Sequence, residues 1–277
     1  MMELYDDVAY ENSKHLTLRY STSFGMSSRL FPRAMQKHIY AIYGLVRIAD
    51  EIVDTYKGPD SATLLDDLEA TTYASIQSGY STNPVVHAFA RTAALYSIDK
   101  PLIGPFFASM RMDLHPQTYV PENYQKYIHG SAEVVGLMCL KVFLDGDKER
   151  YDALRDGAAA LGSAYQKVNF LRDMAADYQE LGRLYFPGVS YEAFDDTAKQ
   201  AIVDDIKQDF AKALPALQQL PVTSRRATMM SYVYYAELLK KLENTPADVI
   251  KTTRIRLPSR RKLTLMVRTL LKEGVKR

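Results

Sequence analysis

The recurrence of apolar residues at helical spacing is the feature that most limits the folds open to this chain. Apolar residues return every three or four positions through most of the 277 residues, and the alternating pattern typical of strands is scarce. Breaks such as Asn83-Pro84 and Phe186-Pro187-Gly188 separate the periodic stretches. The pattern predicts helices over residues 34–57, 61–78, 84–96, 101–112, 121–129, 132–144, 150–181, 196–219, 224–244 and 260–273. Because no flexible linker or fixed-period repeat divides them, we expect one all-α domain over residues 1–277.

The composition excludes several classes of protein. With 47% hydrophobic and 25% charged residues, the chain has the balance of a globular protein rather than of a disordered one. The single cysteine, Cys139, rules out an internal disulfide and a multi-cysteine zinc site, and we expect it to be buried and inert. The longest stretch without charged residues, 70–90, is interrupted by polar residues and Pro84, so it does not predict a membrane span. The acidic start, Glu3 to Asp7, is unlike a secretion signal, and we expect a cytoplasmic protein.

Charge is distributed unevenly along the chain. Residues 251–277 contain ten lysines and arginines and one acidic residue, Glu273, so this segment carries +9 and the remainder −7 in a chain of net charge +2. Charge alone is compatible with nucleic acid, an anionic membrane surface or phosphorylated small molecules as partners. Apolar residues interleave with the charges over residues 263–271, as in an amphipathic helix. Two interpretations stay open: a terminal helix packed on the body with a solvated basic face, and a helix in peripheral contact with a membrane.

The predicted helix over residues 34–57 carries a polar stripe within an otherwise apolar sequence. Tyr43, Arg47, Asp50 and Asp54 are spaced by four, three and four residues, and at about 100° per residue they share an arc of about 60°. Their neighbours are mostly isoleucine, leucine, valine and alanine, so we expect this stripe to face an enclosed cavity.

The predicted helix over residues 150–181 repeats this arrangement. Gln166, Asn169, Asp173 and Asp177 share an arc of about 80°, and Arg172 lies at its edge. Carboxylates one turn apart, as in both stripes, repel each other unless a cation neutralises them. Acidic pairs on a solvated surface are the alternative for a single motif, but two such pairs in apolar surroundings favour Mg²⁺, which prefers hard oxygen ligands and shares them with substrate phosphates. The arginine of each stripe would then hold phosphate oxygens.

Other kinds of active site find no support in the sequence. A di-iron bundle needs Glu-x-x-His on two helices, and no glutamate here has histidine three residues later. The five histidines show no zinc-ligand spacing. The chain also lacks a glycine-rich nucleotide loop and a Gly-x-Ser-x-Gly nucleophile elbow.

With both acidic helices identified, the chain resembles the squalene/phytoene synthase family of head-to-head prenyl transferases. Six segments carry the resemblance in the family's order: residues 20–24 (YSTSF), 49–54 (ADEIVD), 110–114 (MRMDL), 127–136 (YIHGSAEVVG), 166–177 (QKVNFLRDMAAD) and 182–187 (GRLYFP). They extend over nearly the whole chain. The resemblance implies the all-α isoprenoid synthase fold, with a central cavity between two facing aspartate-bearing helices.

The resemblance also implies roles for individual residues. Five would ligate Mg²⁺ bridging to two prenyl diphosphates: Asp50, Asp54, Asn169, Asp173 and Asp177. Nine would contact diphosphate oxygens: Tyr20, Ser21, Thr22, Ser23, Arg47, Gln166, Arg172, Tyr235 and Arg254. Phe24 and Tyr43 would lie near the reacting carbons, and catalysis would depend on the four aspartates with Arg47, Arg172 and Tyr43. Tyr235 and Arg254 rest on a weaker match, because residues 245–253 read as a loop. We expect the cavity floor at Met26, Phe106 and Met230.

Three positions depart from the family pattern. Glu51 stands where a second aspartate is commoner, which keeps the charge. Glu133 occupies a place where the family usually has glycine, and His129 one where tyrosine is frequent. The longer acidic side chain would either intrude on the cavity or support a metal ligand, and the sequence leaves both open.

The activity implied by the resemblance is the condensation of two geranylgeranyl diphosphates to phytoene through a cyclopropylcarbinyl diphosphate, an early step of carotenoid synthesis. Phytoene formation ends in proton loss, so NADPH is not expected unless the product is squalene. The alternative is a squalene or dehydrosqualene synthase that uses two farnesyl diphosphates. A non-catalytic relative acting as a binding or assembly module would be marked by loss of the aspartates, and all four are present. The expected partners are prenyl diphosphates and no nucleic acid.

Overall fold

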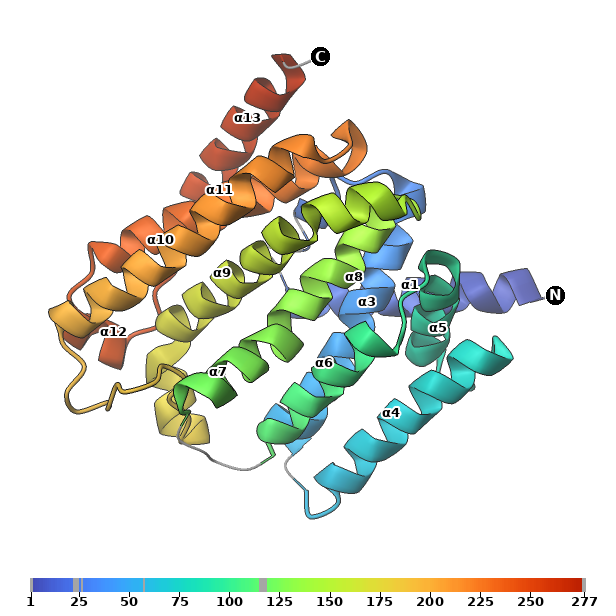
Figure 1. Cartoon of the computed structure of the whole chain (residues 1–277), viewed down its shortest axis with the longest axis horizontal. Coiled ribbons are helices and arrows are strands. Elements are labelled where there is room, and N and C mark those ends of the chain that lie inside the picture. The colour runs from blue at the N-terminus through green and yellow to red at the C-terminus, as the bar shows by residue number, and fades with distance from the viewer. Residues whose placement is uncertain (1, 22–24, 26, 57, 115–118, 276–277) are drawn as a thin grey trace.

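The computed structural model describes residues 2–21, 25, 27–56, 58–114 and 119–275, and helices are the only regular elements in these ranges (Figure 1). In chain order they are α1 (Met2–Tyr20), α3 (Arg33–Asp50), the π-helix η1 (Glu51–Tyr56), α4 (Ser61–Ser78), α5 (Pro84–Tyr96), α6 (Lys100–Met112), α7 (Pro121–Ile128), the π-helix η2 (His129–Glu133), α8 (Val134–Phe143), α9 (Lys148–Leu181), α10 (Asp196–Gln219), α11 (Val222–Glu243), α12 (Ala247–Thr252) and α13 (Ser259–Val275). The all-α prediction is confirmed.

Helix α9 is the axis around which the other elements are arranged. It has 34 residues and runs between α8 on one side and α10 and α11 on the other (Figure 1). One apolar cluster joins α9 to α10 and α11 through residues such as Val168 and Ile206. A second joins α3 to α5, α6 and α8 through residues such as Ile42 and Phe107. Both predicted polar stripes therefore belong to helices anchored in large cores, which keeps the stripes rigid.

The predicted segments agree with the structure at α4, α5 and α10, whose bounds coincide with the expected ranges. The sequence pattern missed α1, because its buried face includes Ser13 and Thr17 rather than apolar residues alone. Their hydroxyls donate within the helix, to the carbonyl oxygens of Ala9 at 3.2 Å and Ser13 at 2.8 Å, so they are buried without a polar penalty. The expected loop over residues 245–253 was also wrong, since α12 forms there as a helix of six residues.

The helix predicted over residues 34–57 is α-helical only as far as Asp50 and then continues as η1. A π-helix closes on i→i+5 hydrogen bonds, so each residue turns less about the axis than in an α-helix. The 60° arc calculated for an ideal α-helix does not hold at Asp54, which lies in η1. Within the described ranges, no helix combines the length and apolar character needed to cross a bilayer.

Candidate active site

A cavity of about 580 Å³ lies between α3, η2, α8, α9, α10 and α11. Its wall changes character along α9: Leu154, Ala158 and Leu161 line one part, whereas Gln166, Asn169 and Arg172 line the other. At a rise of about 1.5 Å per residue, these residues span about 27 Å of the helix. The cavity therefore has a long apolar part that joins a polar end.

Nine of the sequence-predicted site residues line this cavity, but the four aspartates Asp50, Asp54, Asp173 and Asp177 are not among the lining residues. Those that line it are Tyr20, Ser21, Tyr43, Arg47, Gln166, Asn169, Arg172, Tyr235 and Arg254. Thr22, Ser23 and Phe24 lie outside the described residues, as does Met26. Of the other two residues expected at the floor, Met230 lines the cavity, but Phe106 does not. That expectation was wrong because Phe106 packs in the second core cluster, with 1% of its surface exposed.

At the polar end, the first acidic motif is held by Arg47. Its guanidinium forms an ion pair with Glu51, lies 3.7 Å from Asp50 Oδ2, and stacks over the ring of Tyr20 at 4.4 Å from the centroid. Burial raises the pKa of Asp50 to about 8, with a further increase from the charge of Asp54, while Arg47 acts in the opposite direction. The charge of Arg47 therefore does not offset the effect of burial on Asp50, and a further cation would stabilise the carboxylate.

The second acidic motif lies between two arginines that both line the cavity. Arg172 donates from Nε to Asp173 Oδ1 at 2.8 Å, and Arg254 Nε lies 2.7 Å from the same oxygen. Arg254, which the resemblance assigned to diphosphate oxygens by a weaker match, thus lies beside the second acidic motif. One turn further, burial raises the pKa of Asp177 to about 7, and the charges of Asp173 and Asp54 add to the increase. The two motifs face each other closely enough to interact electrostatically.

Tyrosines complete the polar end. Tyr235 donates from its hydroxyl to Asn169 Oδ1 at 3.3 Å and stacks on Tyr165, with the ring centroids 4.0 Å apart. Tyr43 is half-buried, and burial raises its pKa, so the phenol stays protonated at neutral pH. These side chains present hydroxyl and amide groups to the cavity and place aromatic rings beside them.

Arg183 is a functional candidate that the sequence reasoning did not identify. Its buried guanidinium donates to Asp54 Oδ1 at 2.6 Å, to the carbonyl oxygen of Asp113 at 2.7 Å and to that of Val53 at 3.3 Å. Tyr127 donates its hydroxyl to Asp113 Oδ2 at 2.8 Å. Arg183, Asp113 and Tyr127 all belong to segments that carried the family resemblance, which was the available signal. Arg183 thereby fixes the position of Asp54.

The donor set fits Mg²⁺, although the ligands are not preassembled as a closed site. Within the ranges that the structure describes, no three acidic, histidine or cysteine side chains converge closely enough to hold an ion by themselves. Mg²⁺ usually binds through one or two carboxylates and completes its shell with water and substrate phosphates, so paired aspartates suffice. Burial is the main cause of the raised pKa values of Asp50 and Asp177, and the charges of neighbouring aspartates add to it, so a bound cation would stabilise both carboxylates. Asp50, Asp54, Asn169, Asp173 and Asp177 would hold the ions.

Glu133, His129 and Cys139 differ in their position relative to the cavity. Glu133 does not intrude on the cavity, because it accepts a hydrogen bond from His129 Nδ1 at 2.8 Å and neither residue lines the wall. That bond is the main reason why the pKa of His129 is raised. Cys139 was expected to be buried, but it is half-buried and lines the cavity. Desolvation raises the pKa of its thiol to about 12, which keeps the thiol protonated and unreactive at neutral pH.

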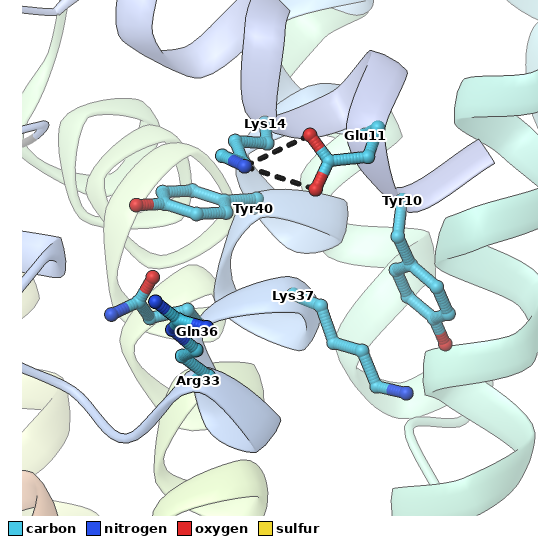
Figure 2. A pocket seen from close by; sticks show the side chains of 7 residues that line it. All are labelled: Tyr10, Glu11, Lys14, Arg33, Gln36, Lys37 and Tyr40. Carbon is cyan, nitrogen blue, oxygen red and sulfur yellow. Dashed lines mark hydrogen bonds and ion pairs between the residues drawn. The ribbon is translucent and has the colours of Figure 1, made fainter. Parts of the chain in front are cut away.

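A second pocket, of about 380 Å³, lies between α1 and α3 (Figure 2). Lys14 donates to both carboxylate oxygens of Glu11, at 2.9 and 2.8 Å, and the amine of Lys37 lies 5.0 Å from the ring centroid of Tyr10. This pocket contains a single carboxylate, which is already paired, and lacks a long apolar wall. It therefore does not compete with the larger cavity as an active site.

Comparisons with known proteins agree with this geometry. The family model described as squalene/phytoene synthase matches residues 17–263. The 15-cis-phytoene synthase of Synechococcus elongatus is 28% identical over an alignment of 296 positions, which covers 96% of this chain and 94% of that protein. The 4,4'-diapophytoene synthase of Staphylococcus haemolyticus is 24% identical over 72% of this chain and 68% of its own length. A solved structure of a dehydrosqualene synthase in complex with ligand covers 98% of both chains with a TM-score of 0.80 at 19% identity, which confirms the expected fold.

Proposed function

The chain belongs to the squalene/phytoene synthase family, and from this premise we propose that it condenses two molecules of geranylgeranyl diphosphate head to head to form phytoene. The observation that carries the proposal is a pair of facing acidic motifs, each paired with an arginine that lines the polar end of a long apolar cavity. Diphosphate groups would bind at the polar end, and the isoprenoid chains would occupy the apolar part. The relative from Synechococcus elongatus, which aligns over 94% of its length, supports phytoene as the product.

The residues at the polar end have the chemistry needed to ionise an allylic diphosphate. When bound, Mg²⁺ would stabilise the charge that develops on the diphosphate leaving group. Arg47, Arg172 and Arg254 line the cavity and would hold diphosphate oxygens through charge-assisted hydrogen bonds. Gln166 and Tyr235 would orient the same group. All of these interactions strengthen as negative charge accumulates on the leaving oxygens, so they lower the barrier to ionisation.

The apolar part of the cavity protects the carbocation that ionisation leaves behind. The double bond of the second substrate would capture this cation, and loss of a proton from the resulting cation would close the ring of the cyclopropylcarbinyl diphosphate. Departure of the second diphosphate and rearrangement would then give a 1-1′ linked cation. Water would quench either cation as an alcohol, so the walls must exclude it. Tyr43 lies at the boundary between polar and apolar surfaces, where its ring can stabilise a passing cation. Loss of a proton ends the sequence, and no reductant is consumed.

The use of two farnesyl diphosphates is the alternative that the comparisons favour most. The relative from Staphylococcus haemolyticus is named for a C30 product, 4,4'-diapophytoene. Both reactions would use the same polar end and differ in the length of apolar chain accommodated. Retention of all four aspartates argues against a non-catalytic assembly module.

A product assay tests the proposal. Purified protein with Mg²⁺ is offered farnesyl or geranylgeranyl diphosphate, with and without NADPH, and the extracted hydrocarbon is identified by chromatography and mass. A C40 hydrocarbon formed without NADPH is the expected result, whereas a C30 hydrocarbon would replace phytoene by squalene or dehydrosqualene. EDTA should stop the reaction and added Mg²⁺ should restore it. Full turnover in EDTA would contradict the proposed metal dependence.

A further inference from the structure

The outer face of α13 carries an apolar stripe with no partner among the described residues. Leu263, Val267 and Leu271 are 56%, 48% and 66% exposed. Their spacing of four residues places them within an arc of about 80°. Arg260 lies on the same face one turn earlier, and Arg268 lies beside the stripe, and both are exposed. The stripe and its cations form the amphipathic surface typical of helices that lie in a membrane interface.

The inner face of α13 fixes which side points outward. Leu265 and Thr269 are buried, 6% and 5% exposed, against the rest of the molecule. Arg261 donates to Glu237 of α11 at 2.7 Å, and the amine of Lys262 lies 5.4 Å from the ring centroid of Tyr234, also in α11. Figure 1 shows α13 beside α11 with its C-terminal end extending past it. The apolar stripe is therefore held away from the body by contacts on the opposite face.

Helix α13 is also linked directly to the cavity. Tyr234, over which Lys262 lies, belongs to the cavity wall. Arg254, five residues before α13 begins, lines the cavity and pairs with Asp173 at 2.7 Å. Ile255, which follows Arg254, is buried and anchors the connection to the core. The inner face of α13 and the segment that precedes it therefore contact the cavity wall at Tyr234 and Arg254.

We propose that α13 seats this protein on an anionic lipid bilayer, with the stripe Leu263, Val267 and Leu271 in the headgroup region. Charge decides between a bilayer and a second copy of the chain. Residues 251–277 carry ten basic residues against one acidic residue, so two copies meeting at this face would repel each other, whereas anionic headgroups would attract it. Three side chains are also far too few for a stable dimer interface, which needs about 800 Å² from each partner.

Binding at α13 would also affect release of the product, and this effect, unlike the docking itself, rests on the proposed function. A long hydrocarbon without polar groups is insoluble in water, so it needs an apolar phase to receive it. A bilayer bound at α13 would supply such a phase one helix away from the cavity wall, because α13 packs on α11 and α11 lines the cavity. Release would then be faster from the membrane-bound protein than from the protein in solution.

Vesicle flotation with the full-length chain tests the docking independently of any activity. The vesicles are phosphatidylcholine alone, or phosphatidylcholine with about one third phosphatidylglycerol. We expect the triple variant Leu263→Ser/Val267→Ser/Leu271→Ser to bind the anionic vesicles about 100-fold more weakly than wild type, because it removes the apolar groups that enter the interface. Arg260→Gln/Arg268→Gln should weaken binding to anionic vesicles about 30-fold and leave binding to neutral vesicles unchanged.

The matched control removes exposed apolar side chains from another helix. Leu4 and Val8 of α1 are 74% and 47% exposed, and Leu4→Ser/Val8→Ser should float like wild type. Circular dichroism checks that all variants keep their helix content. The proposal fails if wild type does not bind anionic vesicles, if the triple variant floats undiminished, or if the control variant loses binding equally. A dimer seen by sedimentation and abolished by the triple variant would overturn it in favour of self-association.

Discussion

At the scale of single residues, Arg183 connects the two acidic motifs. Its guanidinium contacts Asp54 of the first motif, while its backbone N–H donates to the carbonyl oxygen of Asp177 in the second at 3.0 Å. The same side chain lies 3.6 Å from the buried carboxylate of Asp113. Because a guanidinium presents donors in a fixed planar fork, it sets the direction of these groups as well as their charge. Arg183 therefore acts as a positioning residue for Asp54.

We expect Arg183→Gln to lower kcat/KM and to weaken binding of Mn²⁺, used as a paramagnetic substitute for Mg²⁺, by about 10- to 100-fold. Electron paramagnetic resonance measures the Mn²⁺ affinity without turnover. Lys167→Gln is the matched control, since Lys167 is equally buried and bridges Asp205 and Asp209 at 2.6 and 2.8 Å. Both variants should lose stability, but only Arg183→Gln should lose Mn²⁺ affinity. Unchanged Mn²⁺ binding in Arg183→Gln would reduce its role to packing.

The sequence could predict those site residues that share one helix, because spacing alone reports which side of a helix they occupy. Asp173 and Asp177 were predicted in this way: Asp173 pairs with Arg172, which lines the cavity, and Asp177 interacts electrostatically with Asp173. No such local signal exists for Arg183, which meets Asp54 across 129 residues of sequence. Phe106 illustrates the same limit, because it was predicted at the cavity floor but does not line the cavity. Its apolar character fits a cavity wall and a core equally well, and only tertiary packing distinguishes the two.

At the scale of elements, the close approach of η2 to α9 depends on a glycine. A Cβ at Gly162 would lie 2.6 Å from the carbonyl oxygen of Ala132, in η2. Both residues line the cavity. The contact brings η2 against the helix that bears the second acidic motif. The sequence predicted the helices on either side, but not this approach or the π-helical geometry of η2, since both depend on contacts between distant segments.

Gly162→Ala should therefore destabilise the protein by about 2 kcal/mol, because the backbone of η2 must shift to accommodate the methyl group. Gly104→Ala is the matched control: its nearest contact would be the Tyr73 hydroxyl at 3.7 Å. There the helical preference of alanine is offset by crowding against Pro105, and we expect a change below about 0.5 kcal/mol. Urea denaturation followed by circular dichroism measures both free energies of unfolding. Equal free energies of unfolding for the two variants would show that the backbone of η2 shifts without loss of stability.

At the scale of the whole molecule, the active site concentrates carboxylates that folding alone does not neutralise. Burial is the largest cause that raises the pKa of Asp50 to about 8 and those of Asp113 and Asp177 to about 7. In the unfolded chain these groups titrate near their ordinary values, about 4. The metal-free folded state therefore binds more protons than the unfolded state at neutral pH. Because the folded state keeps protons that the unfolded state has already lost, its stability falls as the pH rises toward these pKa values and levels off above them.

The melting temperature in EDTA should consequently fall by about 5 °C between pH 6.5 and 8.5. The window starts at 6.5 because burial lowers the pKa of His38 to about 4, a shift that costs stability only as the pH falls below 6.5. Mg²⁺ competes with protons for the same carboxylates, so it should raise the melting temperature more at pH 8 than at pH 6.5. Asp50→Asn removes one titrating group and should flatten the dependence in EDTA. Differential scanning calorimetry measures these temperatures. A melting temperature that stays constant or rises over this window would mean that the carboxylates are neutralised within the protein, which would remove the electrostatic argument for the metal.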